Sequence, residues 1–142
     1  MTEDLGHRQS TEGVEMVSDN PISAVLISSD IDNCRDFYEN KVGLKLSPDT
    51  IKNHLLFECG DGTTLLVYFR PGEVKADHTQ ARFWSKDVEA DVSELEGRGV
   101  VFEDYDTDYI KTVGHIATTA GIGKSAWFKD PDGNTIALFQ PE

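Results

Sequence analysis

Hydrophobic and polar positions change their spacing several times along the chain. Residues 22–30, ISAVLISSD, form a short apolar run rich in Val and Ile, which predicts a strand. The next segment, DIDNCRDFYENKVGL, predicts an amphipathic helix that stops at Gly43, because its apolar residues recur at three- and four-residue spacing: Ile31, Cys34, Phe37, Tyr38 and Val42. Three strand-like runs follow: LKLSP, NHLLFEC and TTLLVYFRP.

The same order of patterns restarts after Pro71-Gly72. QARFWSKD predicts a strand, and VEADVSELEGRGV predicts a helix with Val88, Val92 and Leu95 on one face. Further strand candidates are VVFEDYD, the stretch around GHIATT, KSAWFKD and NTIALFQ. Between two of these runs, EDYDTDY at 103–109 is interpreted as a solvated loop, because it lacks the glycine and terminal glutamate of a calcium loop.

The two halves are a repeat. A shift of 57 residues lays Ala24, Leu26, Ser28, Asp30 and Ile31 over Ala81, Phe83, Ser85, Asp87 and Val88. A shift of 71 lays the Asp-Gly turn at 61–62 over the one at 132–133. The sequence therefore predicts an α+β fold of two tandem βαβββ modules, over about 20–72 and 78–140, within one domain at 20–142. Residues 1–19 are polar and aperiodic, which predicts a flexible N-terminal extension.

Charge and hydropathy exclude several kinds of partner. The 26 acidic and 13 basic residues give a net charge of −13, which opposes binding to nucleic acid or to an anionic membrane. No apolar run approaches the roughly 18 residues of a membrane span, and the N-terminus lacks the pattern of a signal peptide. We therefore expect a soluble, cytoplasmic protein. Cys34 and Cys59 are 25 residues apart and are expected to be reduced thiols.

Two segments carry a family resemblance. FKDPDGNTIALFQ at 128–140 and the opening ISAVLISSDIDNCRDFYENKVGL resemble the vicinal oxygen chelate superfamily, which includes glyoxalase I, extradiol dioxygenases, fosfomycin-modifying enzymes and bleomycin resistance proteins. The resemblance covers about residues 21–140. It implies a curved, mostly antiparallel sheet around a cleft, and, in the enzymes of the family, a divalent metal held by four strand positions.

Those four positions fall on Ser23, Leu66, Gln80 and Ala137 in this sequence. In metal-dependent relatives they typically hold His, Glu or Gln. Leu66 and Ala137 offer no donor atom, and a neutral serine hydroxyl competes poorly with water for such an ion. Only Gln80 is a plausible weak ligand. We therefore expect neither a metal nor another cofactor, with a displaced site around His54, His78 or His115 as the alternative.

Strand alternation gives the residues expected to face the cleft. If the four positions face it, so do Val25, Ile27, Thr64, Tyr68, Arg82, Trp84, Thr135 and Phe139, because side chains two apart share a face. The opposite face, which is expected to pack under the helices, is apolar: Leu26, Leu65, Val67, Phe83, Ile136 and Leu138. The predicted ligand site comprises Ser23, Leu66, Tyr68, Gln80, Arg82, Trp84, Ala137 and Phe139.

Aromatic side chains with a few convergent polar groups are typical of a small-molecule site. The leading hypothesis is a metal-free binding protein similar to the bleomycin resistance branch, with a planar or aromatic ligand and no catalytic residues. The first alternative is a metal-dependent glyoxalase- or dioxygenase-like enzyme with displaced ligands, and the second is a partner-binding module without a ligand. The resemblance also implies a homodimer, since short two-module chains of this superfamily commonly pair to complete their clefts.

Overall fold

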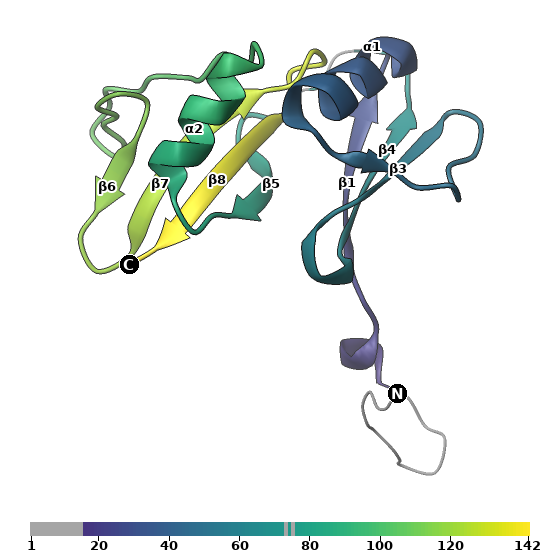
Figure 1. The fold of residues 1–142 in the computed structure, drawn as a ribbon, viewed down its shortest axis with the longest axis horizontal. Helices are drawn as coiled ribbons and strands as arrows, with labels where there is room; N and C mark the ends of the chain where they lie inside the picture. The colour runs from purple at the N-terminus through teal and green to yellow at the C-terminus, as the bar shows by residue number, and fades with distance from the viewer. Residues whose placement is uncertain (1–15, 73, 75) are drawn as a thin grey trace.

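The structure, a computed structural model, describes residues 16–142 except residues 73 and 75. Its strands form two four-stranded sheets with the orders β1-β4-β3-β2 and β5-β8-β7-β6. Figure 1 shows the sheets next to each other, with β1 of the first beside β5 of the second. Most of the predicted extension at 1–19 lies outside the described residues, and the described part contains a short exposed 3-10 helix at Val17–Asp19.

The first module contains β1 (Ser23–Ser28), α1 (Ile31–Asp36), a π-helical continuation (Phe37–Val42), β2 (Lys45–Leu46), β3 (His54–Glu58) and β4 (Thr64–Phe69). The predicted stop is confirmed, since Gly43 caps the helix in the left-handed region at φ 88°. β1 pairs with β4 in parallel, and the other two pairs are antiparallel. The sheet is thus mostly antiparallel, as predicted.

The second module repeats this arrangement. It contains β5 (Thr79–Trp84), α2 (Val88–Gly97), β6 (Ala117–Thr119), β7 (Gly123–Lys129) and β8 (Thr135–Pro141). β5 and β8 are parallel, whereas β8 with β7 and β7 with β6 are antiparallel. The structure confirms the α+β fold with two βαβββ modules.

The same polar turn begins the helix of each module. The backbone N–H of Asp30 donates to Ser28 Oγ (3.1 Å), and Asp30 Oδ1 caps α1 by accepting from the N–H of Asn33 (3.2 Å). In the second module, Ser85 and Asp87 make the matching pair of bonds at 3.2 and 3.1 Å. The Ser-x-Asp repeat in the sequence is therefore a repeated helix N-cap.

The apolar faces of both sheets form one hydrophobic core with the helices. Five of the six side chains predicted to pack under the helices are buried, and Phe83 is half-buried. Phe37 of the first module lies 6.0 Å from Phe128 of the second, measured between ring centroids. The alternation in the sequence therefore identified the core face of each sheet correctly.

The strand predicted at VVFEDYD is wrong. Phe102 makes an isolated bridge to Phe128, and the N–H of Glu103 donates to Trp127 O (2.8 Å), but the pairing ends there. The chain turns away because Thr112 Oγ1 accepts from the N–H of Tyr105 (2.9 Å) and donates to Asp104 (3.2 Å). Val100 and Phe102 are buried nonetheless, so their hydrophobicity reflects core packing rather than a strand.

The turn at 130–134 ties the second module to the first. Asp130 Oδ2 accepts a buried hydrogen bond from Tyr38 Oη (2.7 Å), and Asn134 Nδ2 donates to the carbonyl of Ile27 (2.9 Å). Asp132 Oδ1 accepts from both the N–H and the hydroxyl of Ser29, at 2.8 and 3.0 Å. Burial raises the pKa of Asp130, and the hydrogen bonds from Tyr38 and Asn134 oppose that shift.

The equivalent turn of the first module lacks these ties. Cys59, Asp61 and Thr63 occupy the positions of Asp130, Asp132 and Asn134. Among the described residues, their hydrogen bonds stay local: Cys59 pairs with Thr63 through the backbone, and Thr63 Oγ1 donates to Gly60 O (2.6 Å). The two modules are thus joined at one turn and not at the other.

This asymmetry predicts unequal costs for two matched substitutions. Asn134→Ala should lower the free energy of unfolding by about 2 kcal/mol, because it removes the side-chain donor to the half-buried Ile27 carbonyl and one of the donors to the buried Asp130 carboxylate. Thr63→Ala removes only an exposed local bond and should cost about 0.5 kcal/mol. Urea unfolding of both variants measures the difference, and equal losses would contradict the role given to the second turn.

Candidate functional site

The four positions that the resemblance gives to the metal site lie on β1, β4, β5 and β8, the strands nearest the boundary between the two sheets. Ser23 Oγ is in close contact with Thr64 Oγ1, and Leu66 pairs across the sheet with Val25 and Leu56. Ala137 is buried on β8 opposite Arg82. Two of the four side chains are therefore hydrocarbon, and the serine hydroxyl has a protein partner.

Gln80, the one plausible donor among them, is also engaged. Its Nε2 donates to Asn134 Oδ1 (2.7 Å), and its Oε1 accepts from the backbone N–H of Thr135 (2.8 Å). The register between β5 and β8 shifts at this point, between Thr79 and Ala81, which leaves a bulge beside the Gln80 side chain. Gln80 thus holds β5 to the start of β8, and its carbonyl oxygen is already used.

Arg82 lies over two aromatic rings on the predicted face of the second sheet. Its Cζ is 4.9 Å from the centroid of Trp84 and 4.5 Å from that of Phe139. The two rings meet edge to face at 5.5 Å, since Trp84 and Phe139 are directly paired in the parallel ladder. Phe139 is buried, whereas Trp84 is 69% exposed. This arrangement presents an open indole surface next to a fixed positive charge.

A hollow of about 380 Å³ lies on this sheet, and we call it the second-sheet hollow. Three predicted residues line it, Gln80, Arg82 and Ala137, together with Thr79, Ala81, Ser125 and Trp127. Its volume is within the range of about 300–1,000 Å³ typical of ligand pockets. Trp127 donates from Nε1 to Thr79 Oγ1 (3.1 Å), and the ring of Tyr105 packs edge to face against it at 5.4 Å.

The sequence reasoning missed Ser125 and Trp127. Both lie on β7, where they pair directly with Phe139 and Ala137 and so share their face. The sequence could have identified them, because the in-and-out alternation of side chains, applied to the KSAWFKD strand as it was to β8, places these two on the cleft face. Tyr105 carried no such signal, since it lies in a segment without regular structure.

The predicted residues of the first sheet lie apart from the second-sheet hollow. Tyr68 is half-buried and stacks on His54 with 6.1 Å between ring centroids. Leu66 lies next to it on the same face, which also carries Val25 with 51% of its surface exposed. The structure therefore divides the predicted site into two groups, one on each sheet.

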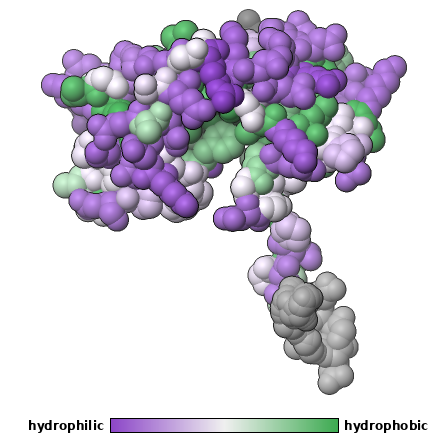
Figure 2. Space-filling view, viewed as in Figure 1, coloured by the Kyte–Doolittle hydropathy of each residue, from purple (hydrophilic) through white to green (hydrophobic). Residues whose placement is uncertain are grey.

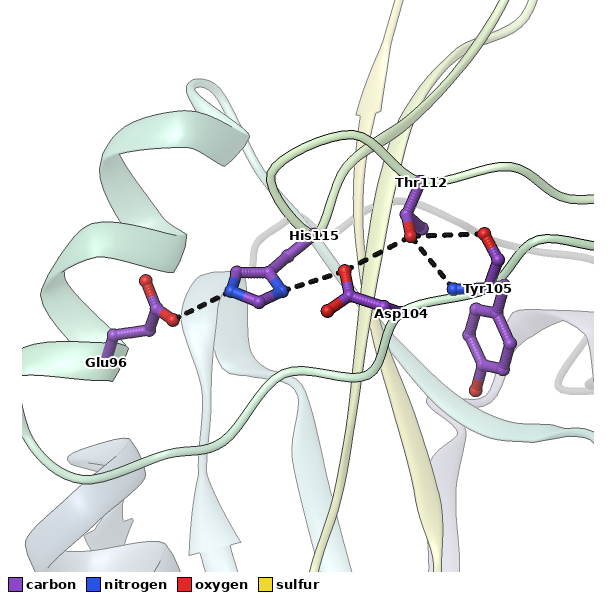
Figure 3. Close-up of polar contacts among 5 residues, drawn as sticks. All are labelled: Glu96, Asp104, Tyr105, Thr112 and His115. Carbon is purple, nitrogen blue, oxygen red and sulfur yellow. Dashed lines mark hydrogen bonds and ion pairs between the residues drawn. The ribbon is translucent and has the colours of Figure 1, made fainter.

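His115, a candidate for a displaced metal site, is held between two carboxylates (Figure 3). Its Nε2 is 3.1 Å from Glu96 Oε2 on α2, and its Nδ1 is 3.0 Å from Asp104 Oδ1. Both ring nitrogens are thus used in contacts that join the 104–115 segment to α2. His54 Nδ1 contacts its neighbour Lys52 O (3.1 Å). Over residues 16–142 without 73 and 75, no three His, Cys, Asp or Glu side chains are grouped as a metal would require.

The comparison with protein families decides the assignment. The model of the glyoxalase/bleomycin resistance protein/dioxygenase superfamily matches residues 21–138. The chain belongs to this superfamily. The resemblance noted in the sequence is therefore confirmed.

Several solved structures share the fold of this chain. TnmS3, an antibiotic-binding protein from Streptomyces sp. CB03234, is 27% identical with a TM-score of 0.65, over 90% of this chain and 100% of that chain. A superfamily member from Sphaerobacter thermophilus DSM 20745 is 22% identical (TM-score 0.64, 85% and 96%). Lactoylglutathione lyase from Agrobacterium tumefaciens is 18% identical (TM-score 0.63, 85% and 92%).

Two further observations concern the chain as a whole. No curated protein matches the chain. None of the helices in the described part of the chain has the length and hydrophobicity needed to cross a membrane.

Proposed function

We propose that this superfamily member is a metal-independent binding protein for a planar or aromatic small molecule. The arrangement of Arg82 with Trp84 and Phe139 beside the second-sheet hollow is the observation that carries the proposal. Trp84 offers a rigid stacking plane, and the guanidinium offers directed donors for an oxygen substituent of the ligand. The antibiotic-binding relative TnmS3 supports a role in binding rather than in catalysis.

Metal independence rests on the side chains at the four family positions. The hydrocarbon side chains of Leu66 and Ala137 supply no donor, and the amide of Gln80 is bonded at both ends. A metal bound at Gln80 Oε1 would compete for this oxygen with the backbone N–H of Thr135. The resulting protein therefore binds its ligand through stacking and charge.

The open faces of the two sheets support a homodimer. Val25 is 51% exposed on the first sheet, and Trp84 is 69% exposed on the second. A second copy that covers the first sheet adds Tyr68 and Leu66 to the ligand site, which a single chain keeps apart from the second-sheet hollow. We propose that two chains pair in this way.

The ligand proposal predicts that binding depends on two side chains of the second sheet. Planar metabolites and antibiotics are screened by quenching of tryptophan fluorescence. Trp84→Phe and Arg82→Gln should each weaken the best hit about thirtyfold, since losing one anchor costs on the order of 2 kcal/mol of binding. Trp127 remains as a reporter in the Trp84 variant because it lines the second-sheet hollow. Arg70→Gln, at an exposed arginine after β4, is the control and should bind normally. Wild-type affinity in both test variants would refute the site.

The metal proposal predicts that divalent ions leave the protein unchanged. Protein purified without chelator should contain well under one metal per chain, and Zn²⁺, Ni²⁺, Mn²⁺ or Fe²⁺ should leave Tm unaltered, because a ligand of the native state must raise its stability. EDTA should likewise have no effect on Tm or on ligand binding. One tightly held metal per chain, with a rise in Tm on reloading, would favour the enzymatic alternative.

The dimer proposal predicts that a charge on the open face separates the chains. Sedimentation should give twice the 15.8 kDa of one chain at micromolar concentration. Val25→Glu should shift the protein to the monomer, because the interface would have to bury an unpaired carboxylate. Val101→Glu is the matched control, since Val101 is 77% exposed outside both sheets, and this variant should stay dimeric. A monomeric wild-type protein would refute the proposal.

A further inference from the structure

The unequal turns leave an open cavity where the two modules meet. The turn at 130–134 is tied to the first module by Tyr38, Ile27 and Ser29. At the equivalent place, the turn at 60–63 and the strand segment 81–84 line a space of about 430 Å³, which we call the junction cavity. Figure 2 shows the molecule hollowed between its two halves, with hydrophobic residues along the inner wall.

The wall of the junction cavity is largely apolar. Ala24 and Leu65 line it from the first module, and Phe83 and Trp84 line it from the second. Ile22, at its edge, is 87% exposed. Exposed apolar surface around a cavity of this size favours binding of a hydrophobic molecule, because binding removes that surface from water.

Arg82 adds a positive charge to this wall. The ion pairs among the described residues do not include Arg82, which contacts the Trp84 and Phe139 rings. A guanidinium next to an apolar wall favours an anionic group on the ligand, since it then gains charge-assisted hydrogen bonds. Asp61, on the turn opposite, disfavours a second negative group.

We propose that the junction cavity is a second ligand site, which borders the second-sheet hollow at Ala81 and Arg82, and that it takes an aromatic molecule with a single anionic group. The ring system occupies the space left by the missing ties between the modules and packs on Phe83 and Trp84. The anionic group lies at Arg82. The ligand thereby joins the modules at the turn where the chain itself does not.

Cys59 provides a specific reporter, because it lines this cavity. It is half-buried, and burial raises the pKa of its thiol, so alkylation is slow but measurable at alkaline pH. The other cysteine, Cys34, is fully buried, and burial raises its pKa to about 12. Alkylation of the folded protein therefore reports on Cys59 alone.

The experiment uses 8-anilinonaphthalene-1-sulfonate as the aromatic anion and N-phenyl-1-naphthylamine as its uncharged analogue. The anion should bind with one saturable site per chain in the cavity and slow the alkylation of Cys59 several-fold. Arg82→Gln should weaken the anion about tenfold and leave the uncharged analogue unchanged, since one charge-assisted contact is lost. Unaltered alkylation of Cys59 at saturating anion would overturn the proposal.

Blocking variants separate this site from the second-sheet hollow. Ala24→Phe should fill the junction cavity and abolish protection of Cys59. If that variant does not fold, wild-type protein alkylated at Cys59 with N-ethylmaleimide replaces it, and it should bind the anion at least tenfold more weakly. Ser125→Phe obstructs the second-sheet hollow and should remove binding of the planar hit without affecting protection of Cys59. Loss of Cys59 protection in Ser125→Phe would assign the anion to that hollow and overturn the second site.

Discussion

A buried carboxylate at the end of β7 determines how the two modules fit together. Asp130 accepts from Tyr38 Oη at 2.7 Å and from Asn134 Nδ2 at 2.8 Å, and its Oδ1 accepts two backbone N–H groups of its own turn. A buried polar network stabilises a fold only when its members are satisfied, and then it specifies one arrangement. The alignment of β1 with β5, and hence the position of Arg82 and Trp84 relative to the first module, depends on this contact.

The same network includes Gln80, the residue at the family's metal-ligand position on β5. Gln80 bonds to Asn134, which bonds in turn to Asp130 and to Ile27 of the first module. The Gln80 side chain, at a potential ligand position, is thus part of the hydrogen-bond network that connects the two modules. Replacing Gln80 with a metal ligand such as His would remove both of its hydrogen bonds. Metal binding at this position and the packing of the two modules are therefore coupled.

The sequence predicted the repeated features well and the unique features poorly. The Ser-x-Asp caps, the Gly43 stop and the apolar faces depend on local spacing, which the repeat shows twice. The Asp130–Tyr38 bond joins residues 92 positions apart, and no local pattern identifies such a pair. VVFEDYD failed as a strand because Thr112, beyond the segment, turns the chain. The predicted site combined residues of both sheets. The structure groups those of the second sheet, with Gln80, Arg82 and Ala137 in one hollow and Trp84 and Phe139 in contact with Arg82.

Net charge is a poor guide to the ligand of such a protein. A charge of −13 suggests attraction for cations, but exposed carboxylates act through water and salt, which screen them within about 10 Å. Arg82 acts at contact distance from any molecule that stacks on Trp84, and the buried ring of Phe139 on its other side keeps water from that face. The local cation therefore outweighs the distant anions in selecting a bound group, while the acidic surface favours solubility. The proposed ligand, an aromatic molecule with one anionic group, matches both the charge of Arg82 and the ring surface of Trp84.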